Sequence, residues 1–291
     1  MSSDLFRFFT TTQLTDNCRF ANSHFAAFTQ NIALAVPPVS TTRVEAETEG
    51  EEEVELPETI HVVSSIIEAQ RYLHERGFDL DTPKVHMAPH IVTVTEYNDA
   101  VLSAFRARGM TRVFNAFHEI ERASKSSDFL SHADAQNYTK GGIANSALEL
   151  FLGMPVMLLR NLFPSRKLFN GSILYVENIL DNEIVLRPGS GPWQHETISV
   201  PRFRFQFTVG TVKVTRFQFP LAAAYSCSIS KSQGQTVDAV ILDLSLSCFL
   251  HGQLYVALSR CRDEKNIVIV SSRKKQISIV YKELLRRAGL K

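Results

Sequence analysis

The stretch SKSQGQTVDAVILDLSLSCFLHGQLYVALSRCR, from Ser230 to Arg262, decides the fold. Its first half is a cluster of small and amide residues that leads into the run Ala239–Leu244, which is apolar except for Asp243 and is typical of a strand buried in a parallel sheet. Its second half, Gly252–Arg260, has apolar residues at helical spacing and ends on Ser259 and Arg260. Two polar clusters that frame a strand and a helix predict a loop-built site on an α/β scaffold.

The loop in the first half has the chemistry of a phosphate or ribose site. Backbone N–H groups near Gly234 can approach a ligand closely, because glycine has no Cβ. The neighbouring hydroxyl and amide side chains can add hydrogen bonds; they belong to Ser232, Gln233, Gln235 and Thr236. Taken alone, such a tetrapeptide as Lys-Ser-Gln-Gly is more typical of a simple turn.

Arg260 is the second half of this predicted site. At the end of a short helix, its guanidinium is expected to reach outward, and a planar fork aimed at a phosphate stabilises charge on a γ-phosphate. The alternative is that Arg260 forms a surface salt bridge, which is the more common role of an arginine. The loop and the arginine together, in this order and at this spacing, favour the functional interpretation.

Bulk composition narrows the class of protein. The chain has 291 residues, 44% of them hydrophobic, which predicts a globular protein of one large or two modest domains. The net charge of +1 predicts no general attraction to nucleic acid, so any basic patch must be local. The four cysteines form no C-x-x-C pair, which argues against a zinc site and favours a reducing compartment. We find neither a secretory signal nor an apolar stretch near the roughly 18 residues of a membrane span.

The N-terminal third reads as mixed α and β structure. Gln13–Ala35, Ile60–Glu75 and Tyr97–Arg108 have helical patterns, and His90–Thr95 alternates like a strand. Seven of the eleven residues of Glu45–Glu55 are glutamate, which predicts a self-repelling, solvated loop. An acidic patch that binds a partner is the less favoured alternative for this segment.

The pattern changes near Gly141. Gly153–Leu162, Gly171–Leu180 and Glu183–Gly189 are short strand-like runs at a spacing of about ten residues, which suggests a small β-barrel. The run Arg202–Val209 alternates strictly, with phenylalanines on one face and Arg202, Arg204 and Gln206 on the other. It is either a half-buried strand with a solvated basic face or a surface for a phosphate backbone.

The α/β pattern returns after Pro220. Leu221–Ser228 is expected to be a helix or tight turn, and Asn266–Ser271 a second buried strand. Lys274–Leu290 is expected to be an amphipathic helix. We therefore predict one α/β domain with a mostly parallel sheet, formed by residues 1–134 and 220–291, with residues 135–219 inserted as a small β-barrel.

The segments ISKSQGQTVDAVILDL (Ile229–Leu244) and HGQLYVALSRCR (His251–Arg262) resemble motifs V and VI of the superfamily 1 DNA helicases of the petite-integration-frequency (PIF) type. The helicase half of Helitron transposon proteins shares these motifs. Ser2–Phe20 resembles the family segment that carries the motif IV arginine, here Arg19. Leu148–Val176 resembles the entry into the family's inserted barrel, and Arg216–Thr236 the return to the main domain.

The resemblance implies a fold and a set of residue roles. Residues 1–134 and 220–291 would form the second RecA-like helicase domain, and residues 135–219 an inserted SH3-like barrel. Arg19 and Arg260 would contact the γ-phosphate of ATP, with Gly234 and Gln235 near the ribose and phosphates. The residues implied to contact DNA or to couple it to the nucleotide are Ser232, Gln233, Thr236, Arg202 and Arg204.

The phosphate-binding motif G-x-x-x-x-G-K-[ST] does not occur in this sequence. We therefore expect the C-terminal portion of an ATP-dependent 5′-to-3′ DNA helicase, without the half that carries the Walker A and B motifs. ATP and Mg²⁺ would be cofactors of the complete enzyme, neither bound stably by this chain alone, and no metal ligand is predicted here. On its own the chain is expected not to hydrolyse ATP.

The partners implied are single-stranded or forked DNA and a P-loop-bearing first RecA-like domain, with no membrane. The resemblance also implies roles in DNA repair, recombination and telomere maintenance, and an intracellular location in the nucleus or mitochondrion. Two alternatives stay open: a non-catalytic nucleic-acid-binding module, and a regulatory protein that docks on the first domain of a helicase.

Overall fold

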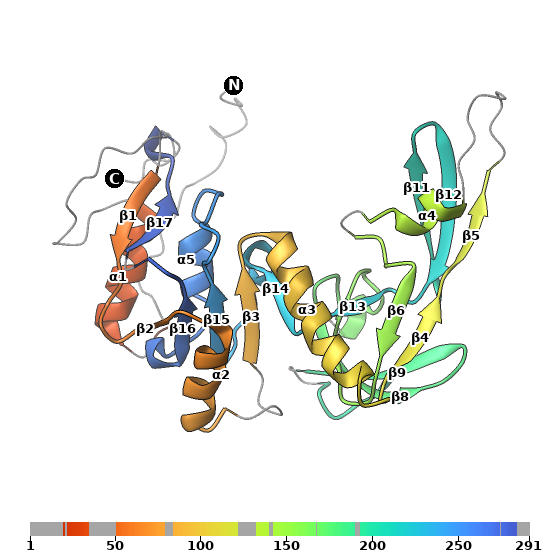
Figure 1. The fold of residues 1–291 in the computed structure, drawn as a ribbon, viewed down its shortest axis with the longest axis horizontal. Helices are drawn as coiled ribbons and strands as arrows, with labels where there is room; N and C mark the ends of the chain where they lie inside the picture. Colours follow the sequence, from red (N-terminus) through yellow and green to blue (C-terminus); the bar gives the residue numbers. More distant parts are fainter. Residues whose placement is uncertain are drawn as a thin grey trace.

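The computed structural model describes residues 20, 22–34, 51–78, 84–121, 132–139, 142–166, 168–189, 193–273 and 275–283. Figure 1 shows an α/β unit at one end of the molecule and a β-rich unit at the other. No helix in the described part of the chain is long and apolar enough to cross a membrane. Arg19 lies outside the described residues. The same is true of most of the segment between Gln13 and Ser23, which is the first part of the predicted helix Gln13–Ala35.

The α/β unit is built on a five-stranded parallel sheet with the order β14-β3-β15-β16-β2. Both of its central apolar strands are buried on both faces, because helices cover each face. The strand bounds are His61–Val63 for β2, Lys84–Ala88 for β3, Ser226–Ser228 for β14, Ala239–Asp243 for β15 and Ile267–Val270 for β16.

Alternate residues of the sheet face two different helix layers. Val240 and Leu242 point toward α1 (Ser23–Leu34) and α5 (Gln253–Leu258). Ile241, on the opposite face, packs with α2 (Ile66–Glu75). The helix α3 (Ile91–Arg106) covers the same face, over β3 and β14. The unit is therefore a three-layer α/β/α arrangement.

The β-rich unit contains three antiparallel sheets, with the orders β10-β9-β8-β7-β13, β11-β12-β5 and β4-β6. Its main core is aliphatic and includes the fully buried Leu150, Met154, Leu158, Leu174 and Leu186. The bounds are Arg112–Asn115 (β4), Phe117–Ile120 (β5), Ala147–Leu150 (β6), Pro155–Leu158 (β7), Ile173–Ile179 (β8), Glu183–Pro188 (β9), Ile198–Pro201 (β10), Phe203–Val209 (β11), Val212–Gln218 (β12) and Leu221–Ala223 (β13). Short helical elements are α4 (His132–Asn137), η2 (Pro164–Arg166), η3 (Ile229–Ser232) and η4 (Glu264–Asn266).

The structure moves the boundary that the sequence predicts for the inserted unit, residues 135–219. β4 pairs with β6 and β5 pairs with β12, so the β-rich unit begins near Arg112. β13 pairs with β7, so it continues to Ala223. The sequence pattern places residues 112–120 and 221–223 in the α/β domain. The strands with which these residues pair lie far away in the sequence, so the pairing leaves no local signal.

Two predicted elements in the α/β unit are wrong. His90–Thr95 was expected to be a strand, but Ile91–Thr95 forms the first turns of α3, whose buried positions are Asn98 and Leu102. The strand at this place is the preceding segment, β3. Leu221–Ser228 was expected to be a helix or tight turn and instead supplies β13 and β14, one to each unit.

Two further errors share one cause. Glu51–Glu55, taken as part of a solvated loop, is β1, and Lys275–Ile279, taken as helix, is β17; the two pair antiparallel. Val54 is buried, while ion pairs from Lys275 to Glu53 at 3.9 Å and from Lys282 to Glu52 at 2.6 Å offset the repulsion among the glutamates. A pairing across more than 200 residues has no signal in either segment alone.

Candidate functional site

Arg260 and the loop that follows η3 are in direct contact. The guanidinium donates from its Nη1 atom to the carbonyl oxygens of Ser232 at 3.3 Å and Gln235 at 3.2 Å. The Nε atom donates to the carbonyl of Val256 at 2.8 Å, and Nη2 donates to the hydroxyl of Ser259 at 2.7 Å. The structure therefore brings together the two polar clusters that the sequence singled out.

The guanidinium of Arg260 is not oriented as predicted. The residue is 6% exposed, and its N–H groups are turned onto main-chain carbonyls instead of reaching into solvent. The expectation of an outward-reaching side chain is wrong, because the short helix α5 ends against the loop. In this arrangement Arg260 acts as a link between α5 and the loop.

The loop itself is a tight turn with an exposed tip. The Ser232 hydroxyl donates to the carbonyl of Ile229 at 2.7 Å and closes η3, so this side chain is buried. Gly234 has a φ of +83°, a left-handed conformation that glycine adopts without steric cost. Gln233, Gly234 and Thr236 are exposed, which leaves their backbone and side-chain groups accessible to a ligand.

Gln235 extends this contact network to the β-rich unit. Its side-chain amide donates from Nε2 to the carbonyl oxygen of Gly171 at 3.2 Å. Gly171 lies in the turn before β8, with a φ of +93°. The loop therefore contacts α5 on one side and the β-rich unit on the other.

The two basic residues on or next to β11 differ in their surroundings. Arg202 donates from Nη1 to the carbonyl of Asn115 and to the Oε1 atom of Gln218, both at 3.0 Å, and burial lowers the pKa of its guanidinium. Arg204 is exposed, with its guanidinium 5.2 Å from the ring centre of Phe217. β11 belongs to the sheet β11-β12-β5, whereas the Arg260 cluster lies beside the parallel sheet.

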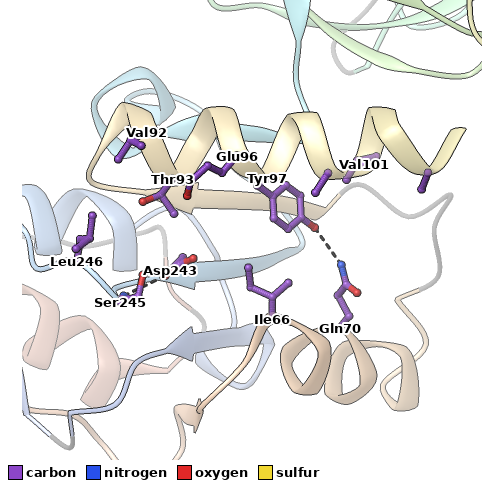
Figure 2. Close-up of a pocket in the computed structure, with 12 residues that line it drawn as sticks. Ile66, Gln70, Val92, Thr93, Glu96, Tyr97, Val101, Asp243, Ser245 and Leu246 are labelled. Atoms are coloured by element: carbon purple, nitrogen blue, oxygen red, sulfur yellow. Dashed lines mark hydrogen bonds between the residues drawn. The ribbon is translucent and has the colours of Figure 1, made fainter. Parts of the chain in front are cut away.

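Sequence reasoning missed a groove between α2 and α3. Figure 2 shows its walls, including Ile66, Val92 and Val101, with Asp243 at the end of β15. The groove has a volume of about 800 Å³ and is mostly apolar. The side chains of Gln70 and Tyr97 join its walls through a hydrogen bond of 3.2 Å.

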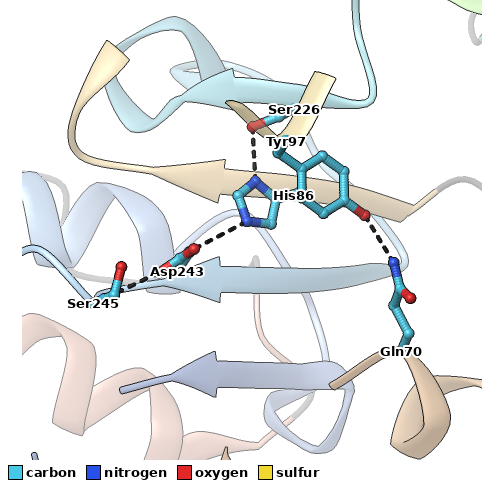
Figure 3. Close-up of polar contacts among 6 residues, drawn as sticks. All are labelled: Gln70, His86, Tyr97, Ser226, Asp243 and Ser245. Atoms are coloured by element: carbon cyan, nitrogen blue, oxygen red, sulfur yellow. Dashed lines mark hydrogen bonds and ion pairs between the residues drawn. The ribbon is translucent and has the colours of Figure 1, made fainter. Parts of the chain in front are cut away.

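A buried polar chain lies under this groove (Figure 3). The Nδ1 atom of His86 is 2.7 Å from the hydroxyl of Ser226, and its Nε2 atom is 3.5 Å from Asp243. These three residues come from the adjacent strands β14, β3 and β15, and Tyr97 stacks on the imidazole with ring centres 3.9 Å apart. Ser226 is 2% exposed, so the arrangement cross-links the sheet and offers no accessible nucleophile.

The residues present fit part of a nucleotide site. An exposed glycine turn and a nearby guanidinium suit the oxygen atoms of a phosphate. The described residues hold no group of three or more His, Cys, Asp or Glu side chains that could bind a metal ion. The cluster could therefore contribute donors to a bound nucleotide.

Comparison with known proteins identifies relatives. Residues 136–179 match the family described as "DNA helicase Pif1, 2B domain". The chain is 29% identical over 211 residues to the ATP-dependent DNA helicase Pif1 of Bdellovibrio bacteriovorus, covering 72% of this chain and 44% of that protein. It is 32% identical over 183 residues to human ATP-dependent DNA helicase PIF1, covering 60% of this chain and 26% of the human protein.

Solved structures show the same fold. The Pif1 helicase from Bacteroides in complex with ADP-AlF3 and single-stranded DNA superposes with a TM-score of 0.61 at 23% identity, over 96% of this chain and 56% of that one. The Pif1 helicase from Candida albicans gives 0.62 at 20% identity, over 93% and 58%. The chain thus spans about half the length, or less, of these relatives. By sequence and by fold, the chain is similar to the Pif1 helicases.

Proposed function

We propose that this chain supplies the second RecA-like domain and the inserted β-rich unit of an ATP-dependent DNA helicase that moves 5′-to-3′ along single-stranded DNA. The observation that carries the proposal is the direct contact between Arg260 and the loop Ser232–Gln235. The two segments that resemble helicase motifs V and VI meet here. The relatives that match the chain are Pif1 helicases, one of them solved with ADP-AlF3 and single-stranded DNA.

In this proposal Arg260 exchanges acceptors when nucleotide binds. The acceptors described for its N–H groups are neutral, namely three carbonyls and the Ser259 hydroxyl, and a charged phosphate oxygen is a stronger acceptor, since charge-assisted hydrogen bonds are about twice as strong as neutral ones. Release of the Ser232 and Gln235 carbonyls would loosen the loop at the same time. The conformation of the loop would then depend on the nucleotide state, and the Gln235 side chain would transmit this change to the β-rich unit.

A second component is required. The sequence contains no G-x-x-x-x-G-K-[ST] motif, so the phosphate cradle and the Mg²⁺ ligands must come from a P-loop-bearing first RecA-like domain. Arg19 would be the second arginine at the γ-phosphate. Because positioning supplies most of the catalysis in phosphoryl transfer, the chain alone is expected to show no ATP hydrolysis above background.

The test is to fuse the first RecA-like domain of a Pif1 relative upstream of Met1. We expect ATP hydrolysis stimulated by single-stranded DNA in the fused protein. Arg260→Ala should lower the catalytic rate by about 10³-fold or more, and Arg260→Lys should restore little, because an ammonium cannot reproduce the planar fork. Arg262→Ala, at an exposed neighbouring position, is the matched control and should keep the parent rate.

The rates are compared well below the unfolding temperature of each variant, since Arg260 is buried. Near-normal hydrolysis by a folded Arg260→Ala protein would contradict the proposal. A fused protein without any activity, from a chain that still binds single-stranded DNA, would instead favour a non-catalytic module derived from a helicase.

Strand displacement on substrates with 5′ or 3′ single-stranded tails checks the polarity. Imaging of the tagged chain in cells checks the expected nuclear or mitochondrial location.

A further inference from the structure

The sheet β11-β12-β5 carries an exposed row of aromatic and arginine side chains. In its register Arg204 lies opposite Phe217, and Phe217 lies opposite Phe117. These three residues are therefore side by side on one face, one from each strand. Figure 1 shows the three strands at the end of the molecule opposite β1 and β17.

The two faces of this sheet have different chemistry. Phe205, Phe207 and Val214 point inward and are buried. Phe117 points outward and is 66% exposed, although most large apolar side chains of the unit are in its core. Exposing an aromatic ring to water costs free energy that burial against a partner would recover.

Cations surround the aromatic pair. The guanidinium of Arg204 is 5.2 Å from the centre of the Phe217 ring, and that of Arg202 is 5.4 Å from the centre of the Phe117 ring. Arg202 is held by Asn115 and Gln218, whereas Arg204 has no ion pair or hydrogen bond to another described residue. Arg204 is therefore the guanidinium that remains available to a ligand.

The acidic residues of this face lie further along the strands. Glu119 is opposite Thr215, one row beyond Phe117, and Glu121 pairs with Lys213 at 3.7 Å. The row that contains both phenylalanines therefore combines two rings with positive charge only. Rings flanked by arginine suit a ligand with flat π-faces and negative charge, which is the chemistry of unpaired nucleotides.

We infer that the face formed by Phe117, Phe217 and Arg204 binds single-stranded DNA, with Phe117 stacking on an unpaired base and Arg204 contacting the adjoining phosphate. This rests on the proposed function and deepens it, because it adds the aromatic pair Phe117 and Phe217 to Arg204, which the resemblance implies to contact DNA. Its test needs no nucleotide and no first RecA-like domain, so it can fail or succeed independently of the ATPase.

The experiment measures binding of the chain to fluorescently labelled oligo(dT) by anisotropy at several salt concentrations. Phe117→Ala should weaken binding by about 5- to 150-fold, the range of base–aromatic stacking, without changing the salt dependence. Arg204→Ala should weaken binding and reduce the slope of log affinity against log salt by about 0.7, the value for one phosphate on a single strand. Phe117→Trp should retain affinity, since it keeps a stacking ring.

Two controls isolate stacking from folding. Phe169→Ala removes a phenylalanine that is 44% exposed elsewhere in the β-rich unit and should bind like the parent. On an abasic strand of equal length, Phe117→Ala should bind like the parent, because no base remains to stack. Urea unfolding of Phe117→Ala should match the parent, since the ring is largely exposed.

Three results would overturn the inference: no binding of the parent chain to oligo(dT) at low salt, parent-like affinity of Phe117→Ala, or an equal loss on the abasic strand. Self-association through this face, seen as a dimer that Phe117→Ala abolishes while DNA binding is unchanged, would also overturn it.

Discussion

The Gln235 side chain donates a hydrogen bond to the Gly171 carbonyl at 3.2 Å, while its own main-chain carbonyl accepts one from Arg260 at 3.2 Å. One residue is thus bonded to both structural units of the protein. The bond to Gly171 comes from the side chain, so it can be removed without touching the loop backbone. The first prediction uses this separation.

Gln235→Ala should lower the free energy of unfolding by about 1 kcal/mol, the typical net value of one hydrogen bond in a partly buried site. Gln233→Ala, two positions earlier and exposed, should change it by less than about 0.5 kcal/mol. Urea denaturation of the isolated chain measures both. Equal stability of the two variants would show that the Gly171 contact does not hold the units together.

Arg260→Ala should be strongly destabilising, apart from any effect on catalysis. It leaves the carbonyls of Ser232, Gln235 and Val256 without this donor, and an unsatisfied buried polar group costs about 1–3 kcal/mol. We expect a loss of at least about 2 kcal/mol in urea unfolding, with Arg262→Ala unchanged. If the variant is as stable as the parent, the hydrogen bonds from the Arg260 guanidinium to these carbonyls do not stabilise the protein in solution.

Gly234→Ala should cost about 1–2 kcal/mol, because alanine resists the left-handed conformation that the φ of +83° requires. A Cβ at this position would meet no atom within 4 Å, so the cost comes from the backbone and not from a clash. Gly234→Asn should cost less, since asparagine tolerates this region better. Thermal unfolding ranks the three proteins, and the order would reverse if a clash, growing with side-chain size, were the cause.

Asp243 should make stability depend on pH in the acid range. Burial would raise the pKa of this carboxyl, but the His86 imidazole 3.5 Å away and the hydrogen bonding from Ser245 outweigh it, and the pKa is lowered below its ordinary value. Because the folded-state pKa is depressed, the stabilisation is fully present above about pH 4–5 and is lost as the pH falls through the folded-state pKa.

The corresponding experiment compares the parent with Asp243→Asn by urea unfolding between pH 7 and pH 2. The stability advantage of the parent should be largest near neutral pH and shrink toward the acid end. Asp99→Asn, on the exposed face of α3, controls for the loss of one negative charge. A difference between parent and Asp243→Asn that stays constant with pH would contradict the assigned role.

The local sequence predicts those elements whose hydrophobic pattern is complete, either as a run of apolar residues or as a strict apolar–polar alternation. The run Ala239–Leu244 is apolar at every position except Asp243, and it is the central strand β15, as expected. The alternation of Arg202–Val209 likewise gives β11 with Phe205 and Phe207 buried and Arg204 exposed. In both cases the side-chain pattern alone fixes which faces are covered.

Elements set by distant partners could not be predicted. β1 carries mostly glutamates and is a strand only because β17 pairs with it. Arg216 sits in a strand-like run as any surface arginine would, yet it is fully buried and donates to the carbonyls of Ala144 at 2.6 Å and Tyr138 at 3.1 Å. Burial lowers the pKa of its guanidinium, and nothing in the sequence around it signals that role.

The candidate site was predicted in part. The loop and Arg260 do meet, because a strand and a returning helix bring their ends together, but the direction of the guanidinium depends on carbonyls that no pattern reveals. Phe117 escaped notice because no strand was predicted around it and residues 112–120 were placed in the α/β domain. Its exposure is visible only once the register of β5 against β12 is known.

β13 ends at Ala223 in the sheet of one unit, and β14 begins at Ser226 in the sheet of the other, so only Ala224 and Tyr225 separate them. Asn98 grips Ser226 at both main-chain atoms, accepting from its N–H at 2.9 Å and donating to its carbonyl at 3.2 Å. This connection is short, its Ser226 end is held by Asn98, and its Ala223 end is hydrogen-bonded into a sheet. The two strands therefore have little freedom to move apart. A rotation of the β-rich unit would therefore act on the edge strand of the parallel sheet, which leads along the chain into the loop Ser232–Gln235.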